Sequence, residues 1–156
     1  MINNMKDNNI KIININNYED MIKFGEKLGA LSFPNMVITM EGDLGAGKTT
    51  ITKGIGKGLN ITRVINSPTF TIMKIYEGRL PLYHMDVYRI DNNSGDDYLE
   101  EYFELGGVTV IEWANNIDAI IPNERLQIEI SINDDTSRTI KIFSNNPKYI
   151  DVINKL

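Results

Sequence analysis

Residues 36–50 read MVITMEGDLGAGKTT, and this stretch decides the fold. The apolar run at 36–40 is typical of a strand that is covered on both faces. Residues 42–49 fit G-x-x-x-x-G-K-[ST], the phosphate-binding loop. The glycines let successive backbone amides turn inward toward phosphate oxygens, and a helix predicted over residues 48–59 adds the positive end of its dipole. The stretch therefore predicts a nucleotide phosphate site in an α/β domain.

The residue types in this loop have separate roles. Lys48 is suited to reach the β- and γ-phosphates, and the Thr49 hydroxyl is suited to ligate Mg²⁺. The alternative is a flexible glycine loop, which the context disfavours because an apolar strand precedes the motif and a helix follows it. The other loop residues expected around the phosphates are Asp43, Leu44, Gly45, Ala46, Gly47 and Thr50.

Two carboxylates end predicted strands near this loop. Asp86 ends a strand at 80–86, and Glu112 ends a strand at 108–112. Ligands of open α/β sheets bind beyond the carboxyl ends of parallel strands, so both acids are candidates for holding Mg²⁺ or orienting the attacking water. The pattern leaves open which of them contacts the metal. The plain alternative for each is an exposed acid that ends a strand.

Weaker features accompany these motifs. The segment 67–69, Ser-Pro-Thr, is either a switch-like loop that senses the γ-phosphate or an ordinary proline turn. His84 is the sole histidine, and we expect it to have a packing role. Arg89 is a candidate for phosphate neutralisation, a partner contact or a surface ion pair. Trp113, the sole tryptophan, is by default a core anchor.

The rest of the chain alternates strand and helix patterns. Asn17 is expected to cap an amphipathic helix that runs to about residue 31, and Ser94 to cap one that runs to about residue 105. Together the patterns predict a three-layer P-loop NTPase-like α/β domain with a mixed, mainly parallel central sheet of unspecified strand order. Further strands are expected at 11–15, 69–76, 126–132 and 139–143, and a terminal helix at Asn146-Pro147.

Length and composition narrow the class of protein. A chain of 156 residues predicts one domain spanning 1–156, with residues 1–9 as a loose N-terminal extension. Cysteine is absent, which excludes disulfide scaffolds and thiolate metal sites. No apolar stretch approaches the ~20 residues of a membrane helix. We therefore expect a cytoplasmic domain that makes no membrane contact. The net charge of −5 predicts that the chain by itself binds nucleic acid poorly.

Four segments, in their order and approximate spacing, resemble the TsaE (YjeE) family, and the likeness runs from about residue 17 to residue 143. The resemblance implies an ATPase subunit of the bacterial machinery that makes threonylcarbamoyladenosine next to the anticodon of tRNA. It also implies work with TsaD, which carries out the transfer, and with TsaB, a scaffold. The segments are Gly42–Thr50, Ser67–Phe70, His84–Arg89 and Ile111–Trp113.

The same resemblance implies roles for individual residues. Lys48 and the loop glycines would bind ATP phosphates, and Thr49 and Glu112 resemble the Mg²⁺ ligands. Asp86 matches a carboxylate needed for hydrolysis and is also a candidate ligand. Three further residues resemble positions close to the nucleotide: Trp113, Arg138 and, near the base, Tyr18.

Two other functions stay open at this point. A small-molecule kinase is one, although such enzymes usually carry an arginine-rich lid and no arginine cluster is present. A nucleotide-sensing interaction module that does not hydrolyse ATP is the other. A GTPase is disfavoured because the guanine motif N-K-x-D is absent. For the ATPase, the few arginines predict slow turnover without partners.

Overall fold

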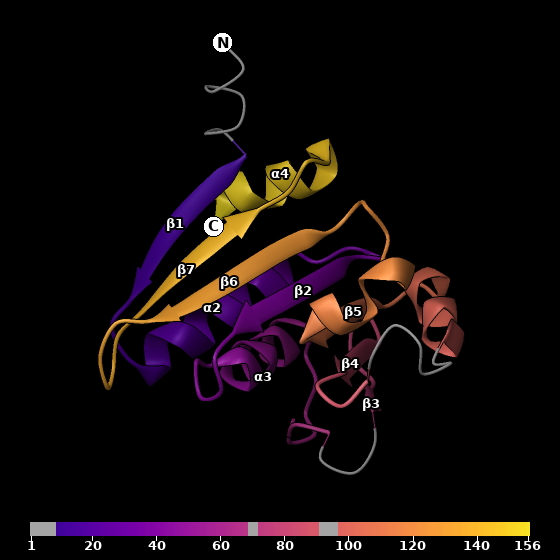
Figure 1. The fold of residues 1–156 in the computed structure, drawn as a ribbon, viewed down its shortest axis with the longest axis horizontal. Coiled ribbons are helices and arrows are strands. Elements are labelled where there is room, and N and C mark those ends of the chain that lie inside the picture. Colours follow the sequence, from indigo (N-terminus) through magenta and orange to yellow (C-terminus); the bar gives the residue numbers. More distant parts are fainter. Residues whose placement is uncertain (1–8, 69–71, 91–96) are drawn as a thin grey trace.

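Figure 1 shows the computed structural model, which describes residues 9–68, 72–90 and 97–156. The predicted cap Ser94, Thr69 of the Ser-Pro-Thr segment and all but the last residue of the N-terminal extension lie outside the described residues. None of the helices in the described ranges combines the length and the apolar character that a bilayer crossing requires. The helices are α2 (Tyr18–Ala30), α3 (Lys48–Gly58) and α4 (Pro147–Lys155), with the 3₁₀ helices η1 (Asp97–Glu104) and η2 (Ala114–Ile120).

Seven strands of the described chain form one sheet in the order β1-β7-β6-β2-β5-β4-β3 (Figure 1). The central pairs β6–β2, β2–β5 and β5–β4 are parallel, whereas β1–β7, β7–β6 and β4–β3 are antiparallel. The predicted α/β class and mixed sheet are therefore confirmed, with the parallel part around the loop strand β2. The strands are β1 (Ile10–Ile15), β2 (Val37–Gly42), β3 (Met73–Tyr76), β4 (Leu82–Asp86), β5 (Val108–Glu112), β6 (Leu126–Ile132) and β7 (Arg138–Phe143).

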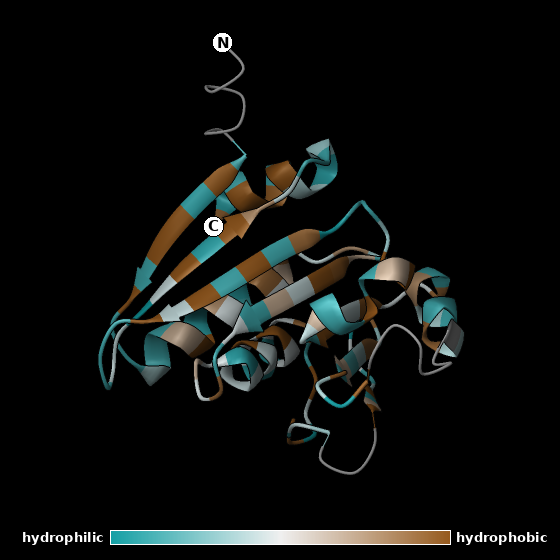
Figure 2. Ribbon diagram, in the orientation of Figure 1, coloured by the Kyte–Doolittle hydropathy of each residue, from teal (hydrophilic) through white to brown (hydrophobic). Residues whose placement is uncertain are grey.

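The two faces of the sheet are covered unequally. Helices α2, α3 and α4 bury the larger core on one face, and η1 and η2 bury a smaller core against β4 and β5 on the other. Over β6, β7 and β1 that second face is open, with Ile12 and Glu129 exposed. Hydrophobic and hydrophilic residues accordingly alternate along these strands (Figure 2). The third layer of the predicted architecture thus consists of 3₁₀ segments over half of the sheet.

Glycines bring α2 and α3 into backbone contact. A Cβ atom at Gly25 would lie 2.4 Å from the carbonyl oxygen of Ile51, and one at Gly54 would lie 2.4 Å from that of Ile22. Such distances are far below van der Waals contact, so each position requires a residue without a side chain. The glycines lower the helix propensity of α3, yet α3 forms over nearly its predicted range because they permit this packing.

We expect Gly54→Ala to lower the free energy of unfolding by about 2–3 kcal/mol, because α2 and α3 must separate to admit the methyl group. Lys57→Ala in the same helix is the matched control; its side chain is exposed, so the change should stay within about 0.5 kcal/mol. Urea denaturation followed by circular dichroism measures both. Equal stabilities for the two variants would contradict the close packing.

Candidate nucleotide and magnesium site

The glycine-rich loop curls between the end of β2 and the start of α3. Gly45 (φ 81°) and Gly47 (φ 117°) adopt the left-handed conformation that favours glycine. Asn17 and Asn146 cap α2 and α4 with their side chains, whereas Gly47 gives α3 no side-chain cap. The first amides of α3 therefore stay available to an anion, which the helix dipole also favours.

Lys48, the first residue of α3, is buried and 6% exposed. Its Nζ donates hydrogen bonds to the carbonyl oxygens of Gly42 and, at 3.4 Å, Asp43. Burial lowers the pKa of Lys48 below its usual value, and the carboxylates of Glu112, Glu41, Asp86 and Asp43 oppose that shift, in this order. The lysine is thus a cation with few competing water contacts, at the centre of the loop.

Glu112 lies at the carboxyl end of β5, next to the start of α3. Its Oε2 accepts a hydrogen bond from the Thr49 hydroxyl at 3.3 Å and faces Nε2 of His84. Glu112 is 3% exposed and His84 is fully buried. The two candidate metal residues Thr49 and Glu112 therefore meet, and His84 contacts the site through Glu112 instead of serving for packing alone.

Asp86 lies directly opposite Glu112 in the parallel register of β4 and β5. Its Oδ2 accepts a hydrogen bond from the Ser67 hydroxyl at 3.2 Å, and its Oδ1 accepts one from the Tyr88 amide at 3.1 Å. Ser67 and Asp86 also line the same cavity as the loop. The structure therefore places Ser67 beside the loop, and both interpretations of its segment stay open.

Trp113 borders the loop as well as the smaller core. Its ring centroid lies 3.8 Å from Lys48 Nζ, and its ring packs against Tyr88 at 4.9 Å. Its backbone has φ 62°, which is rare for a bulky residue and occurs where the surroundings enforce it. A core anchor alone would not need this conformation, so the position next to Lys48 agrees with the role that the family resemblance implies.

Two cavities lie on either side of the loop and share Gly45, Ala46, Gly47 and Thr50. One, of about 270 Å³, is lined by Leu44, Lys48, Thr49, Ser67, Asp86, Glu112 and Trp113 besides the shared residues. The other, of about 310 Å³, is lined by Asn17, Tyr18, Met21, Asp135, Thr136 and Arg138 besides the shared residues. All predicted site residues except Asp43 line one cavity or the other, and Asp43 lies within the loop. Arg89 is exposed and lines neither.

The side chain of Arg138 forms hydrogen bonds with the backbone of the glycine-rich loop. Its Nε donates to the carbonyl oxygen of Ala46 at 3.0 Å, and its Nη2 to that of Gly45 at 3.4 Å. Its Nη1 is bound to the turn carbonyls of Asp134 and Ser137. The guanidinium therefore ties the β6–β7 turn to the loop, a role that the sequence alone does not indicate.

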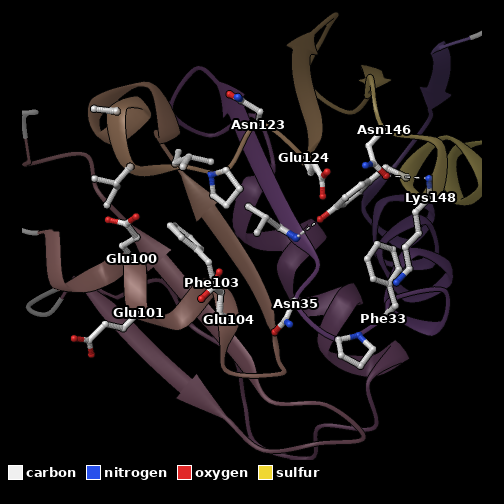
Figure 3. Close-up of a pocket in the computed structure, with 17 residues that line it drawn as sticks. Phe33, Asn35, Glu100, Glu101, Phe103, Glu104, Asn123, Glu124, Asn146 and Lys148 are labelled. Carbon is white, nitrogen blue, oxygen red and sulfur yellow. Dashed lines mark hydrogen bonds between the residues drawn. The ribbon is translucent and has the colours of Figure 1, made fainter.

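A larger cavity, about 1140 Å³, lies at the opposite end of the sheet and shares no residue with the loop (Figure 3). Four glutamates line it, and Figure 3 shows Lys148 close to the ring of Phe33. Unlike the loop, this cavity has no uncapped α-helix start to offset the repulsion between its carboxylates and a phosphate, because Asn146 caps α4. Size alone would therefore select the wrong cavity as the nucleotide site. The glutamates are Glu100, Glu101, Glu104 and Glu124.

The donor set around Thr49 fits Mg²⁺. This cation prefers oxygen ligands and usually takes one or two carboxylates together with substrate phosphates. The Thr49 hydroxyl and the Glu112 carboxylate supply such oxygens, and Asp86 adds a second carboxylate. No group of three or more potential His, Asp or Glu ligands occurs in the described ranges.

The loop and the sheet define a P-loop protein of the α/β class. Its marks are an uncapped helix start behind a glycine loop, a buried lysine and a threonine–glutamate pair. Comparisons with known proteins identify the group within that class. The family model described as "Threonylcarbamoyl adenosine biosynthesis protein TsaE" matches residues 15–140. The chain belongs to the TsaE family.

Relatives cover most of the chain. A tRNA threonylcarbamoyladenosine biosynthesis protein TsaE from Bacillus subtilis is 50% identical over 134 residues, which are 85% of each chain. One from Nostoc is 40% identical over 141 residues, 86% of each chain. The crystal structure of Bacillus subtilis YdiB aligns with a TM-score of 0.83 at 42% identity and covers 94% of this chain and 93% of its own. The fold and family expectations are therefore confirmed.

We expect Arg138→Met to loosen the loop, because two carbonyl oxygens lose a charged donor worth about 1.5–3 kcal/mol. The amide of Ala46, which donates to Asp43 within the loop, should exchange with deuterium at least about tenfold faster. Amides of the central strand β2 should not change. Arg63→Met, at an exposed arginine that lines neither loop cavity, is the control. An unchanged Ala46 rate in Arg138→Met would contradict the contact between Arg138 and the loop.

Proposed function

We propose that this chain is a Mg²⁺-dependent ATPase that supports threonylcarbamoyl transfer to the adenosine next to the anticodon of tRNA, together with TsaD- and TsaB-like proteins. One observation carries the proposal: the side chains of Lys48, Thr49 and Glu112 lie together at the uncapped start of α3. Membership of the TsaE family supports the biosynthetic role.

Phosphate binding falls to the backbone and to Lys48. The amides at the uncapped start of α3 lie where the helix dipole favours negative charge. Burial removes water that would otherwise screen the lysine, so its attraction to phosphate oxygens is strong. Tyr18 and Arg138 line the neighbouring cavity, where the nucleoside would extend.

Thr49 and Glu112 would hold the cation. When bound, Mg²⁺ supplies charge neutralisation at the β- and γ-phosphate oxygens. Glu112 brings its carboxylate to the site already bound to the Thr49 hydroxyl, so both oxygen ligands are in place. Asp86, held by Ser67 and the Tyr88 amide, orients the attacking water and accepts its proton at a carboxylate oxygen.

The composition of the site supports dependence on partners. Arginine stabilises the charge that develops in phosphoryl transfer, and supplying one in trans accelerates related enzymes by orders of magnitude. Within the described chain, no arginine lines the cavity that holds Lys48, Asp86 and Glu112. The isolated chain therefore turns over slowly, and the partner complex completes the site. With a net charge of −5, the chain leaves tRNA binding largely to its partners.

Two substitutions test the ATPase directly. Lys48→Ala should weaken ATP binding at least about tenfold in calorimetry with Mg²⁺, because it removes the charge-assisted contacts to phosphate. Asp86→Asn should retain binding and lower hydrolysis about a hundredfold or more, because it removes the water-orienting carboxylate. Arg63→Met, at an exposed arginine that lines neither cavity, should behave as the unsubstituted chain. Normal tRNA modification by Asp86→Asn would indicate a nucleotide-sensing module that does not need hydrolysis.

We expect TsaD- and TsaB-like proteins together to raise ATP turnover by at least about tenfold, since they complete the transition-state stabilisation. Steady-state phosphate release measures the rate with the chain alone and with both partners. An equal rate would contradict dependence on partners. Transfer of the γ-phosphate to a metabolite instead of water would identify a small-molecule kinase.

A further inference from the structure

His84 is a buried polar residue that the proposed hydrolysis does not use. It lies on β4, is 0% exposed and is the only histidine in the sequence. Alternation along β4 places it on the same face as Leu82 and Asp86, which is the face covered by α3. Its Nε2 faces Oε2 of Glu112, and its Nδ1 is buried without a hydrogen-bond partner among the described residues.

This arrangement differs from that of a packing residue. A histidine buried for packing alone would bond both ring nitrogens or be replaced by an apolar side chain at lower desolvation cost. Here the polar contact of the ring is directed at Glu112. Burying an unprotonated Nδ1 without a partner costs less free energy than burying an N–H group without one. The ring proton therefore belongs on Nε2, which donates a hydrogen bond to the carboxylate.

Two donors, one on α3 and one on β4, converge on one oxygen of Glu112. The Thr49 hydroxyl approaches Oε2 from α3 at 3.3 Å, and the His84 ring approaches the same atom from within the sheet. A glutamate side chain has several rotatable bonds, and the two contacts restrain the position of Oε2 and with it the rotamer of the side chain. Residues that fix a ligand in this way typically contribute ten- to a hundredfold to metal affinity.

We propose that His84 is a positioning residue for the Mg²⁺ site: it holds Glu112 in the orientation that the cation requires. The inference rests on the proposed function, since it concerns the same metal. It adds a residue that acts through Glu112 without touching nucleotide or metal. His84 therefore matters for the gain in nucleotide affinity that Mg²⁺ provides and has little effect on nucleotide binding without metal.

Two variants separate positioning from packing. His84→Leu removes the donor and keeps a side chain of similar volume, whereas His84→Gln keeps an N–H donor near the position of Nε2. Tyr83→Phe is the matched control, because Tyr83 is also buried on β4 but points to the opposite face. Calorimetry with ADP, once with Mg²⁺ and once with EDTA, gives the affinity gain due to the metal, and thermal melting monitors the fold.

We expect His84→Leu to reduce the Mg²⁺-dependent gain in ADP affinity about tenfold or more, with affinity in EDTA within about twofold of the unsubstituted chain. His84→Gln should recover most of the gain, and Tyr83→Phe should keep all of it. A folded His84→Leu with the full gain, or a His84→Gln no better than His84→Leu, would overturn the inference.

Nuclear magnetic resonance tests the contact without nucleotide or metal. Because the chain has one histidine, its ring gives a single set of ¹⁵N signals. We expect a proton on Nε2 that exchanges slowly with water, and a larger shift of this signal in Glu112→Gln than in Asp86→Asn. A proton on Nδ1, or equal shifts in both variants, would overturn the inference even if His84→Leu did not fold.

The two proposals fail in different ways. If the unsubstituted chain binds neither ATP nor ADP with Mg²⁺, the proposed function is wrong, whatever the ring signals show. If it binds them with a clear gain from Mg²⁺, and His84→Leu retains that gain, the ATPase proposal stands and the positioning role of His84 is wrong.

Discussion

The parallel pairing of β2, β5 and β4 is the constraint on which the candidate site depends. Parallel strands end at the same edge of a sheet, so the residues that leave these ends gather there. The register pairs Asp86 with Glu112 and Met40 with Glu112, which sets both acids beside the loop that follows β2. A slip of one residue would turn either carboxylate to the opposite face.

This convergence concentrates negative charge beside the loop, and groups of the loop offset it. The carboxylates of Glu41, Asp43, Asp86 and Glu112 all act on Lys48, so side-chain charge near the loop is negative overall. A triphosphate would meet repulsion from these acids. The uncapped amides of α3, its dipole and a divalent cation between phosphate and carboxylate would offset it. The surplus of carboxylate is thus consistent with binding a nucleotide together with its metal.

The loop motif predicted the site because its chemistry is local. Glycines, lysine and threonine act at fixed spacing along one segment, so Gly47, Lys48 and Thr49 could be assigned without tertiary information. Asp86 and Glu112 followed from the rule for strand ends. Arg138 could be placed near the site only through resemblance, and its bonds to the loop carbonyls depend on how the β6–β7 turn folds back.

The contact of His84 with Glu112 depends on strand order, which one sequence does not reveal. The sequence spacing places His84 and Asp86 on one face of a strand, but it does not indicate that β5 is the neighbouring strand. The 3₁₀ character of η1 and η2 was also beyond prediction, because short apolar patterns do not distinguish a 3₁₀ from an α-helix. Asp135 and Thr136 line a cavity, but they belong to a turn whose polar sequence is typical of any exposed loop. The sequence therefore did not indicate their position at the site.

The glycine contact between α2 and α3 links the stability of the fold to the shape of the site. The start of α2 supplies Tyr18 and Met21 to one cavity, and a Cβ atom at Gly47 would lie 3.0 Å from Met21 Cε. Since α2 packs against α3 through backbone contact, the position of the Tyr18 side of the cavity relative to the loop depends on this packing. A residue far from any phosphate, such as Gly54, therefore contributes to the geometry of the site through the crossing of two helices.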